Sequence, residues 1–187
     1  MKKRIFIAIN LPEEVKKKLL EFQKKWSDLP VRWTKKENLH LTLAFLAYLS
    51  DEELKKVLEA TKEVAEKHPP FFIEITKIDF GAKYKGVPRL IWAEGERSEE
   101  LTSLKKDLDK TLSQTIHFSP ENRDFLPHIT LARIRKWDWQ RIEPDQRPEI
   151  CEYISEKFEV KSIEIMESRL KRGGAQYLIL RSFGLNK

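Results

Sequence analysis

The chain has 187 residues, with 36 Lys or Arg against 30 Asp or Glu and therefore a formal net charge of +6. This length suits one domain or two small lobes that share a core, and a 40% hydrophobic content excludes a disordered chain. The single cysteine, Cys151, excludes a disulfide framework and a four-cysteine zinc site, and no segment approaches the ~20 apolar residues of a membrane span, so we expect a cytoplasmic protein without membrane contact.

The first half of the chain predicts alternating strands and helices. Pro12 suits the first turn of a helix, and Ser50 with Glu53 forms a capping-box signature at the start of another. Pro69 and Pro70 end that second helix. The expected elements are a strand at 4–9, a helix at 12–26, a strand at 39–49, a helix at 50–67 and a strand at 71–80.

The second half repeats much of this order. Ser98 is a suitable cap for an amphipathic helix with leucines at helical spacing, and Gly173-Gly174 is typical of a hairpin turn. The expected elements are a strand at 89–93, a helix from 98 to about 112, a strand at 126–134, a helix within 147–157, a strand at 158–166 and a strand at 177–180.

The two halves correspond at a nearly constant offset. His40 and His128 are 88 residues apart, and Ile78 and Ile163 are 85 residues apart. No glycine-rich linker separates the halves. We therefore expect one bilobal domain over residues 1–187, built from two β-α-β-α-β units at about 1–88 and 89–187.

Two of the four histidines share one motif. The segments 40–43 (HLTL) and 128–131 (HITL) both read His-apolar-Thr-apolar, and Ala follows each. In a strand, residues i and i+2 point to the same face, so each motif places an imidazole and a hydroxyl on one face and anchors the other face in a core. A threonine two residues after two of four histidines arises by chance in about one per cent of cases at average composition.

This residue set suits phosphodiester chemistry. A neutral imidazole can take a proton from an attacking hydroxyl or water, and an imidazolium can protonate the departing oxygen. The hydroxyls of Thr42 and Thr130 can hold the non-bridging phosphoryl oxygens. His68 and His117 lack the threonine, and no HxH or HExxH spacing is present, so we expect no metal site and no cofactor.

With its paired motifs, the chain resembles the two-histidine (2H) phosphoesterase superfamily, and within it the bacterial and archaeal RNA 2′,3′-cyclic phosphodiesterases, historically called 2′-5′ RNA ligases. The likeness covers nearly the whole chain and includes Arg32-Trp33, Asn38-Leu39 and the second-motif flanks Pro127 and Arg133. It implies an α+β fold with mainly antiparallel sheets around a central cleft. The β-α-β order of the predicted elements is equally compatible with parallel strands, so the antiparallel direction is what the resemblance implies.

The resemblance also implies an activity, the hydrolysis of RNA 2′,3′-cyclic phosphate ends to 2′-phosphomonoesters, with tRNA fragments among the candidate substrates. His40 would donate the proton to the leaving 3′ oxygen, and His128 would activate water. Thr42, Thr130 and Arg133 would bind the phosphate. Strand alternation alone places Arg133 on the face opposite His128, so a bend or strand end has to bring it to the phosphate. Ala47 departs from the family, which often has Gly after Phe-Leu.

Two alternatives remain open from the sequence. The same residues could join a cyclic phosphate end to a 5′-hydroxyl, or the protein could bind RNA ends with little turnover. No obligate protein partner is inferred. Several aromatic residues are candidates either for the core or for stacking on a terminal base: Trp33, Phe45, Phe125, Trp137 and Trp139.

Overall fold

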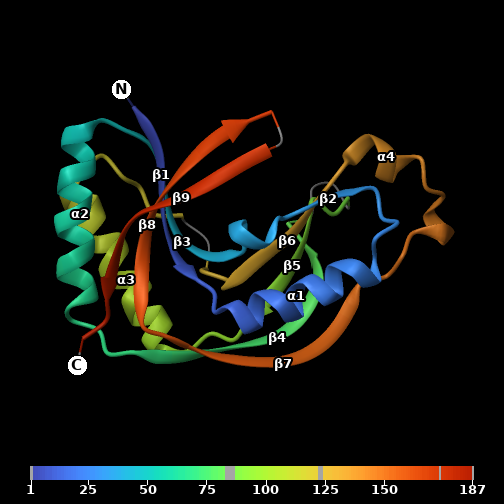
Figure 1. Cartoon of the computed structure of the whole chain (residues 1–187), viewed down its shortest axis with the longest axis horizontal. Helices are drawn as coiled ribbons and strands as arrows, with labels where there is room; N and C mark the ends of the chain where they lie inside the picture. The colour runs from blue at the N-terminus through green and yellow to red at the C-terminus, as the bar shows by residue number, and fades with distance from the viewer. Residues whose placement is uncertain (1, 83–86, 122–123, 173, 187) are drawn as a thin grey trace.

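A computed structural model describes residues 2–82, 87–121, 124–172 and 174–186, and its strands form one curled sheet (Figure 1). The strands are β1 (Lys3–Asn10), β2 (Val31–Trp33), β3 (His40–Leu49), β4 (Phe71–Gly81), β5 (Leu90–Gly95), β6 (His128–Ile134), β7 (Cys151–Val160), β8 (Ser162–Lys171) and β9 (Gly174–Gly184). The helices are α1 (Glu13–Lys25), α2 (Asp51–Ala65), α3 (Glu99–Thr115) and α4 (Lys136–Gln140), with short 3-10 turns η1 (Lys36–Asn38) and η2 (Pro144–Gln146).

The sheet has the strand order β7-β4-β5-β6-β3-β1-β8-β9, and β2 pairs with β6 beside this path. Every pairing between the described strands is antiparallel, which confirms the direction implied by the family resemblance. The two strands that carry the His-x-Thr motifs, β3 and β6, are neighbours at the middle of the sheet. Three further strands extend from each of them.

The strands on the two sides do not follow the order of the chain. β4, from the first half, pairs with β5 and β7 of the second half. In return, β8 from the second half pairs with β1 of the first half, and β9 follows it. Each side of the sheet is therefore built from both halves.

The helices start where the sequence predicts and pack on the apolar face of the sheet. Ser50 accepts the backbone N–H of Glu53, while the Glu53 carboxylate accepts the N–H of Ser50, which completes the expected capping box. Ser98 caps α3 in the same way through the N–H of Leu101. α2 and α3 lie side by side at one end of the molecule (Figure 1). Their buried residues and those of α1 join one core with the apolar residues of the strands.

Two predicted elements are wrong. The helix expected within 147–157 is replaced by β7, an edge strand whose exposed side chains alternate with half-buried ones and, at Phe158 and Val160, with buried ones. The single strand expected at 158–166 is two strands, because the chain turns at Lys161 between β7 and β8. The predicted turn at Gly173-Gly174 lies partly outside the described residues, but β8 and β9 pair as a hairpin on both sides of it. No helix in the described part of the chain is long and apolar enough to cross a membrane.

Candidate active site

The two motifs meet where β3 pairs with β6. Leu41 is the direct partner of Ile129, and both side chains are buried in the core. In this antiparallel register His40 lies level with Thr130, and Thr42 lies level with His128. All four of these residues lie on the face opposite Leu41 and Ile129, and all four are partly exposed. The two imidazoles therefore occupy opposite corners of a four-residue arrangement, with the two hydroxyls at the other corners.

Both imidazoles are held through the same ring nitrogen. Nδ1 of His40 lies 2.7 Å from the carbonyl oxygen of Asn38, and Nδ1 of His128 lies 2.8 Å from that of Leu126. A carbonyl oxygen only accepts hydrogen bonds, so each Nδ1 carries the proton and donates it. Nε2 of each ring is then the nitrogen that can exchange a proton. Nε2 of His40 lies 3.0 Å from the hydroxyl of Thr42, within its own motif.

His40 is enclosed by aromatic rings. The ring of Phe6 on β1 lies 4.9 Å from the imidazole, and that of Tyr177 on β9 lies 5.2 Å from it. Burial is the main reason that the pKa of His40 falls to about 4, and the positive charges of His128 and Lys16 act in the same direction. The hydrogen bond to Asn38 opposes these effects. His40 of the free protein is thus neutral at pH 7.

The side chain of Asn38 links the turn before His40 to β9. Its side-chain amide donates to the carbonyl oxygen of Ala175 at 2.7 Å, and its side-chain oxygen accepts the N–H of Tyr177 at 3.2 Å. The start of β9 is thereby fixed to the turn that precedes His40. Asn38 is 8% exposed, so these bonds are made largely away from water. One residue therefore positions the imidazole through its main chain and the neighbouring strand through its side chain.

His128 has a different neighbourhood. Its ring lies 4.5 Å from that of Trp92 on β5, and Glu94 is its direct partner across the β5–β6 pair. The indole of Trp92 donates to the carboxylate of Glu94 at 2.9 Å. The two histidines thus lie in unequal surroundings within one site.

A β-bulge brings Arg133 to the face of the histidines. On β5, Trp92 pairs with Thr130 but Leu90 pairs with Arg133, so β6 contains one extra residue, Leu131. Leu90 and Trp92 share a face, and Trp92 contacts His128, so Arg133 lies on that face as well. Without this bulge, strict strand alternation would place Arg133 on the face opposite His128.

The first motif contains an equivalent β-bulge. Between β1 and β3 the register shifts at Leu43, which places Phe45 at the position on β3 that Arg133 occupies on β6. Phe45 is 60% exposed. The other aromatic candidates divide between surface and core: Trp137 is exposed, Trp139 is buried, and Trp33 and Phe125 pack against the core.

Sequence reasoning missed several residues of this site: Phe6, Lys16, Asn38, Trp92 and Tyr177. Asn38 belongs to a segment that resembles the family, but nothing in the local sequence indicates that Asn38 binds β9. Lys16 reads as one of three consecutive lysines on a helix, yet its side chain is buried while those of Lys17 and Lys18 are exposed. Contacts between distant segments give no local signal.

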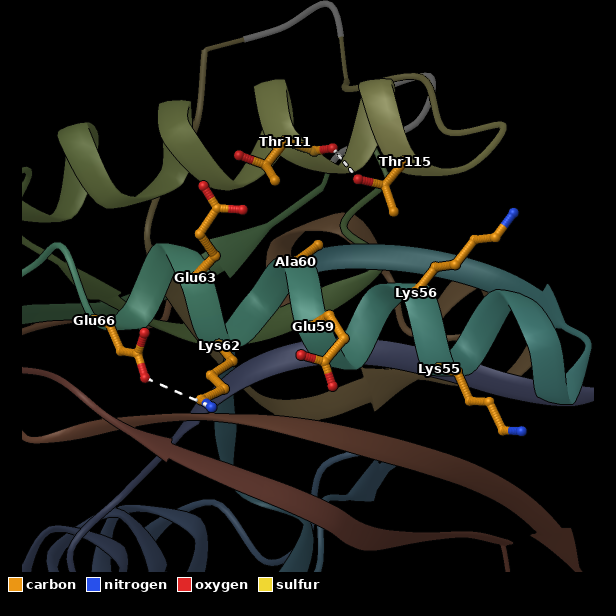
Figure 2. Close-up of a pocket in the computed structure, with 9 residues that line it drawn as sticks. All are labelled: Lys55, Lys56, Glu59, Ala60, Lys62, Glu63, Glu66, Thr111 and Thr115. Atoms are coloured by element: carbon orange, nitrogen blue, oxygen red, sulfur yellow. Dashed lines mark hydrogen bonds and ion pairs between the residues drawn. The ribbon is translucent and has the colours of Figure 1, made fainter.

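A cavity of about 580 Å³ lies elsewhere, between α2 and α3 (Figure 2). Lysines and glutamates line it, so its wall carries charges of both signs, and Lys62 pairs with Glu66 at 3.9 Å on its rim. Figure 2 shows the ammonium group of Lys55 extending away from α3. No histidine lines this cavity, so the chemistry of the motifs belongs to the sheet. Within the described residues, no three His, Cys, Asp or Glu side chains gather as metal ligands would.

Known proteins match the chain along nearly its whole length. A relative named RNA 2′,3′-cyclic phosphodiesterase from Methanocaldococcus jannaschii is 28% identical over 186 residues, which cover 96% of this chain and 99% of the relative. A relative of the same name from Archaeoglobus fulgidus is 30% identical over 185 residues, with the same coverage of both chains.

Solved structures match as well. A Thermus thermophilus structure has a TM-score of 0.83, with 28% identity and 97% coverage of both chains. Escherichia coli LigT complexed with 3′-AMP has a TM-score of 0.75, with 27% identity and full coverage of both chains. The family model described as LigT like Phosphoesterase matches twice in tandem, over residues 9–92 and 93–177. These matches confirm the resemblance that the sequence motifs indicate, and the chain belongs to the LigT-like phosphoesterase family.

Proposed function

We propose that this protein hydrolyses the 2′,3′-cyclic phosphate at the end of an RNA to a 2′-phosphomonoester, using His40 and His128 as an acid and base pair and no metal ion. The observation that carries this proposal is the arrangement on β3 and β6, where two anchored imidazoles and two hydroxyls share one face of the sheet. The curated relatives from several archaea and bacteria are named for this hydrolysis. Those names favour hydrolysis over the ligation that the sequence left open.

In the proposed reaction, Nε2 of His128 takes a proton from water as the water oxygen bonds to phosphorus. The bond between phosphorus and the 3′ oxygen breaks, and Nε2 of His40 gives that oxygen its proton. The product keeps the phosphate on the 2′ oxygen, and one water is consumed. The fixed Nδ1 donors support this scheme because they leave Nε2 of both rings available for proton transfer.

Thr42, Thr130 and Arg133 are the proposed phosphate ligands. Each hydroxyl lies level with the imidazole of the other motif, so a phosphorus atom between the imidazoles would also lie between the hydroxyls. Arg133 adds a fixed positive charge on the same face. The non-bridging oxygens, where negative charge builds up, would therefore be bound from both strands.

The low pKa of His40 has to be reconciled with its role as the acid. A cyclic phosphodiester is negatively charged, and a negative charge beside the ring favours the imidazolium. We therefore propose that His40 is protonated as the substrate binds. On this scheme substrate binding takes up a proton, and the pKa of His40 in the complex is higher than about 4.

A direct assay tests the activity. An oligoribonucleotide with a 2′,3′-cyclic phosphate end, incubated with the protein in EDTA, is expected to give the 2′-phosphate, detected by mass spectrometry and ³¹P NMR. His40→Ala and His128→Ala should each lower kcat by about 10²–10⁴-fold, the usual contribution of a proton transfer. His117→Ala is the matched control, because His117 is exposed on the described surface and lies outside both motifs. Full activity in either motif variant, or activity only with added metal, would contradict the proposal.

A sulfur substitution separates the roles of the two imidazoles. A cyclic substrate with sulfur at the bridging 3′ position has a leaving group that needs no protonation. His40→Ala should therefore recover most of its lost rate on this substrate, whereas His128→Ala should not. The opposite pattern would show that the acid and the base are interchanged.

The wider setting is part of the same proposal. We propose one bilobal unit whose repeats meet near residue 88, a cytoplasmic location, and RNA ends that include tRNA fragments as substrates. The tandem family match over 9–92 and 93–177 supports the duplication. The positive net charge of +6 suits a polyanionic partner.

A further inference from the structure

A carboxylate lies on the side of the candidate active site that holds His128. Glu94 on β5 is the direct partner of His128 on β6, and residues directly opposite each other in a sheet have Cβ atoms about 4.5–5.5 Å apart on one face. On the other side of the site, the direct partner of His40 is Asn10 on β1, whose side chain is neutral. Of the two rings, the one proposed as the base therefore has a carboxylate as its cross-strand partner.

The carboxylate of Glu94 is held in place without an ion pair. Its Oε1 accepts the indole N–H of Trp92 at 2.9 Å, and the indole ring lies 4.5 Å from the imidazole of His128. Within the part of the chain that the structure describes, no ion pair joins Glu94 to a cation, and Lys77, its partner on β4, pairs with Asp79 instead. A carboxylate has about four acceptor positions on its two oxygens, so Glu94 can accept further hydrogen bonds beside the base.

The imidazole itself does not need these acceptors. Nδ1 of His128 already donates to the carbonyl oxygen of Leu126 at 2.8 Å, which fixes the tautomer of the ring. In the proposed reaction, Nε2 accepts a proton from the attacking molecule. The remaining acceptor positions of Glu94 are therefore available to the molecule that His128 deprotonates.

Water and an alcohol differ in how many hydrogen bonds they donate. In the proposed reaction, Nε2 of His128 takes one hydrogen of the attacking water, and the other hydrogen needs an acceptor of its own. The hydroxyl of methanol, or the 5′-hydroxyl of an RNA, has a single hydrogen, which Nε2 would take. A carbon atom replaces the second hydrogen, and it would remove water from the Glu94 carboxylate without offering a hydrogen bond in return.

We infer that Glu94 accepts the second hydrogen of the attacking water and thereby selects water over alcohols as the nucleophile, an inference that rests on the proposed function. With an alcohol, the alcohol oxygen would bond to phosphorus and Nε2 of His128 would take its proton. The bond to the 3′ oxygen would break, and His40 would protonate that oxygen. The product would be a 2′-phosphodiester instead of a 2′-phosphomonoester, so the two nucleophiles give different products from one substrate.

The test measures how one substrate divides between the two nucleophiles. Adenosine 2′,3′-cyclic phosphate is incubated with the protein in water that contains methanol, and mass spectrometry gives the ratio of the 2′-methyl phosphodiester to the 2′-monophosphate. Glu94→Leu has no acceptor, so this ratio should rise about tenfold over the wild type, the loss expected for one hydrogen bond to a charged group. Glu94→Gln keeps a neutral acceptor and a similar shape, so its ratio should rise less.

The product ratio separates the selection of a nucleophile from a structural role. A structural role of Glu94, acting through Trp92 on the imidazole, would slow attack by both nucleophiles and leave the ratio unchanged. Glu96→Gln is the matched control, because Glu96 is an exposed carboxylate just beyond β5, and its ratio should equal that of the wild type. A ratio in both Glu94 variants that stays within about twofold of the wild type would overturn the inference, whatever the change in rate.

An RNA acceptor tests the same selection with the alcohol that RNA itself offers. An oligonucleotide with a 5′-hydroxyl also brings phosphates toward the Glu94 carboxylate, so Glu94→Gln should raise the ratio of 2′-5′ joined product to hydrolysed product, and more so at low salt. An unchanged ratio at low salt would contradict the selection.

Failure of the proposed function has a different signature from failure of this inference. If the wild-type protein leaves the cyclic phosphate unopened in water and in aqueous methanol, the proposed function fails and the role of Glu94 fails with it. If the wild type opens the cyclic phosphate and the Glu94 variants divide it between water and methanol as the wild type does, the inference alone is wrong.

Discussion

At the scale of single residues, the two histidines are alike in anchoring and unlike in surroundings. Both donate Nδ1–H to a carbonyl two residues earlier, so the repeat fixes the same tautomer twice. His40 then lies against Phe6 and Tyr177, whereas His128 lies against Trp92 beside Glu94. In the proposed reaction the two rings exchange protons in opposite directions, which needs this kind of difference, because identical rings in identical surroundings would favour the same charge state.

The pKa of His40 has a consequence for stability. Its value of about 4 in the folded state lies below the 6.5 of an unperturbed histidine, so between these values the unfolded state binds more protons. The free energy of unfolding should therefore fall as the pH falls from about 6.5 to about 4. For a partly exposed ring we expect His40 to account for about 2 kcal/mol of this loss.

Urea unfolding of the wild type and of His40→Gln at several pH values measures this effect. The variant should lose less stability than the wild type over this range, since Gln does not titrate. An NMR titration of the His40 ring in the wild type checks the pKa directly. Parallel stability curves for the two proteins would contradict the assignment.

At the scale of elements, the packing of β4 against β5 supports the second histidine. Gly81 on β4 pairs with Leu90, and a Cβ at position 81 would overlap the ring of Trp92. The absence of a side chain at Gly81 is therefore what lets the indole lie beside His128 at 4.5 Å. Glycine is used here for close approach and not for an unusual backbone angle.

Gly81→Ala should displace Trp92 and reduce activity through His128. We expect a fall in kcat of about tenfold together with a change in tryptophan fluorescence, because the indole also loses its bond to Glu94. Gly184→Ala is the matched control, since its added Cβ would meet only the Lys161 carbonyl oxygen at 4.0 Å. Unchanged activity and fluorescence in Gly81→Ala would show that the indole has room to adjust.

The sequence predicts these elements well where local signals are strong. The capping residues Ser50 and Ser98 mark the starts of α2 and α3, and the His-x-Thr alternation places both histidines on one face. The error at β7 has a physical cause. Over 151–157 the side chains are mostly polar, Tyr153 is 80% exposed and only Ile154 packs against the core, so this part of the segment shows no continuous apolar face. Pairing with β4, over 70 residues earlier in the chain, decides its structure.

In the candidate site, too, the sequence predicts the features that depend on neighbouring residues but not those that depend on distant strands. Spacing along the chain predicts the motif residues, but the bulge at Leu131 that turns Arg133 toward them depends on pairing with β5. The contacts of Asn38 with Ala175 and Tyr177 join positions more than 130 residues apart. Such contacts form only when the whole sheet has closed, so spacing along the chain does not reveal them.

At the scale of the whole molecule, the exchange of strands makes the two halves interdependent. Segment 1–88 contains β4 but neither of its partners, and segment 89–187 contains β8 but not β1. Each segment also contains only one His-x-Thr motif. The site therefore requires both halves in one folded unit.

Segments 1–88 and 89–187 produced separately should each lack cooperative thermal unfolding by circular dichroism, because each has strands with exposed pairing edges and an incomplete core. Mixing equal amounts should restore a cooperative transition and part of the activity. A sharp unfolding transition in either isolated segment would show that the halves are independent after all.

The strand exchange also constrains how such a duplicated chain could have arisen. A gene for one such repeat would have encoded a protein with a single His-x-Thr motif and a strand without its neighbour. Two copies of that protein could have satisfied each other only as a swapped homodimer, and the swap would have delivered the second imidazole in the same event. Tandem fusion of two such genes would make that partner permanent and would leave the copies free to differ, as Phe45 and Arg133 differ at equivalent places.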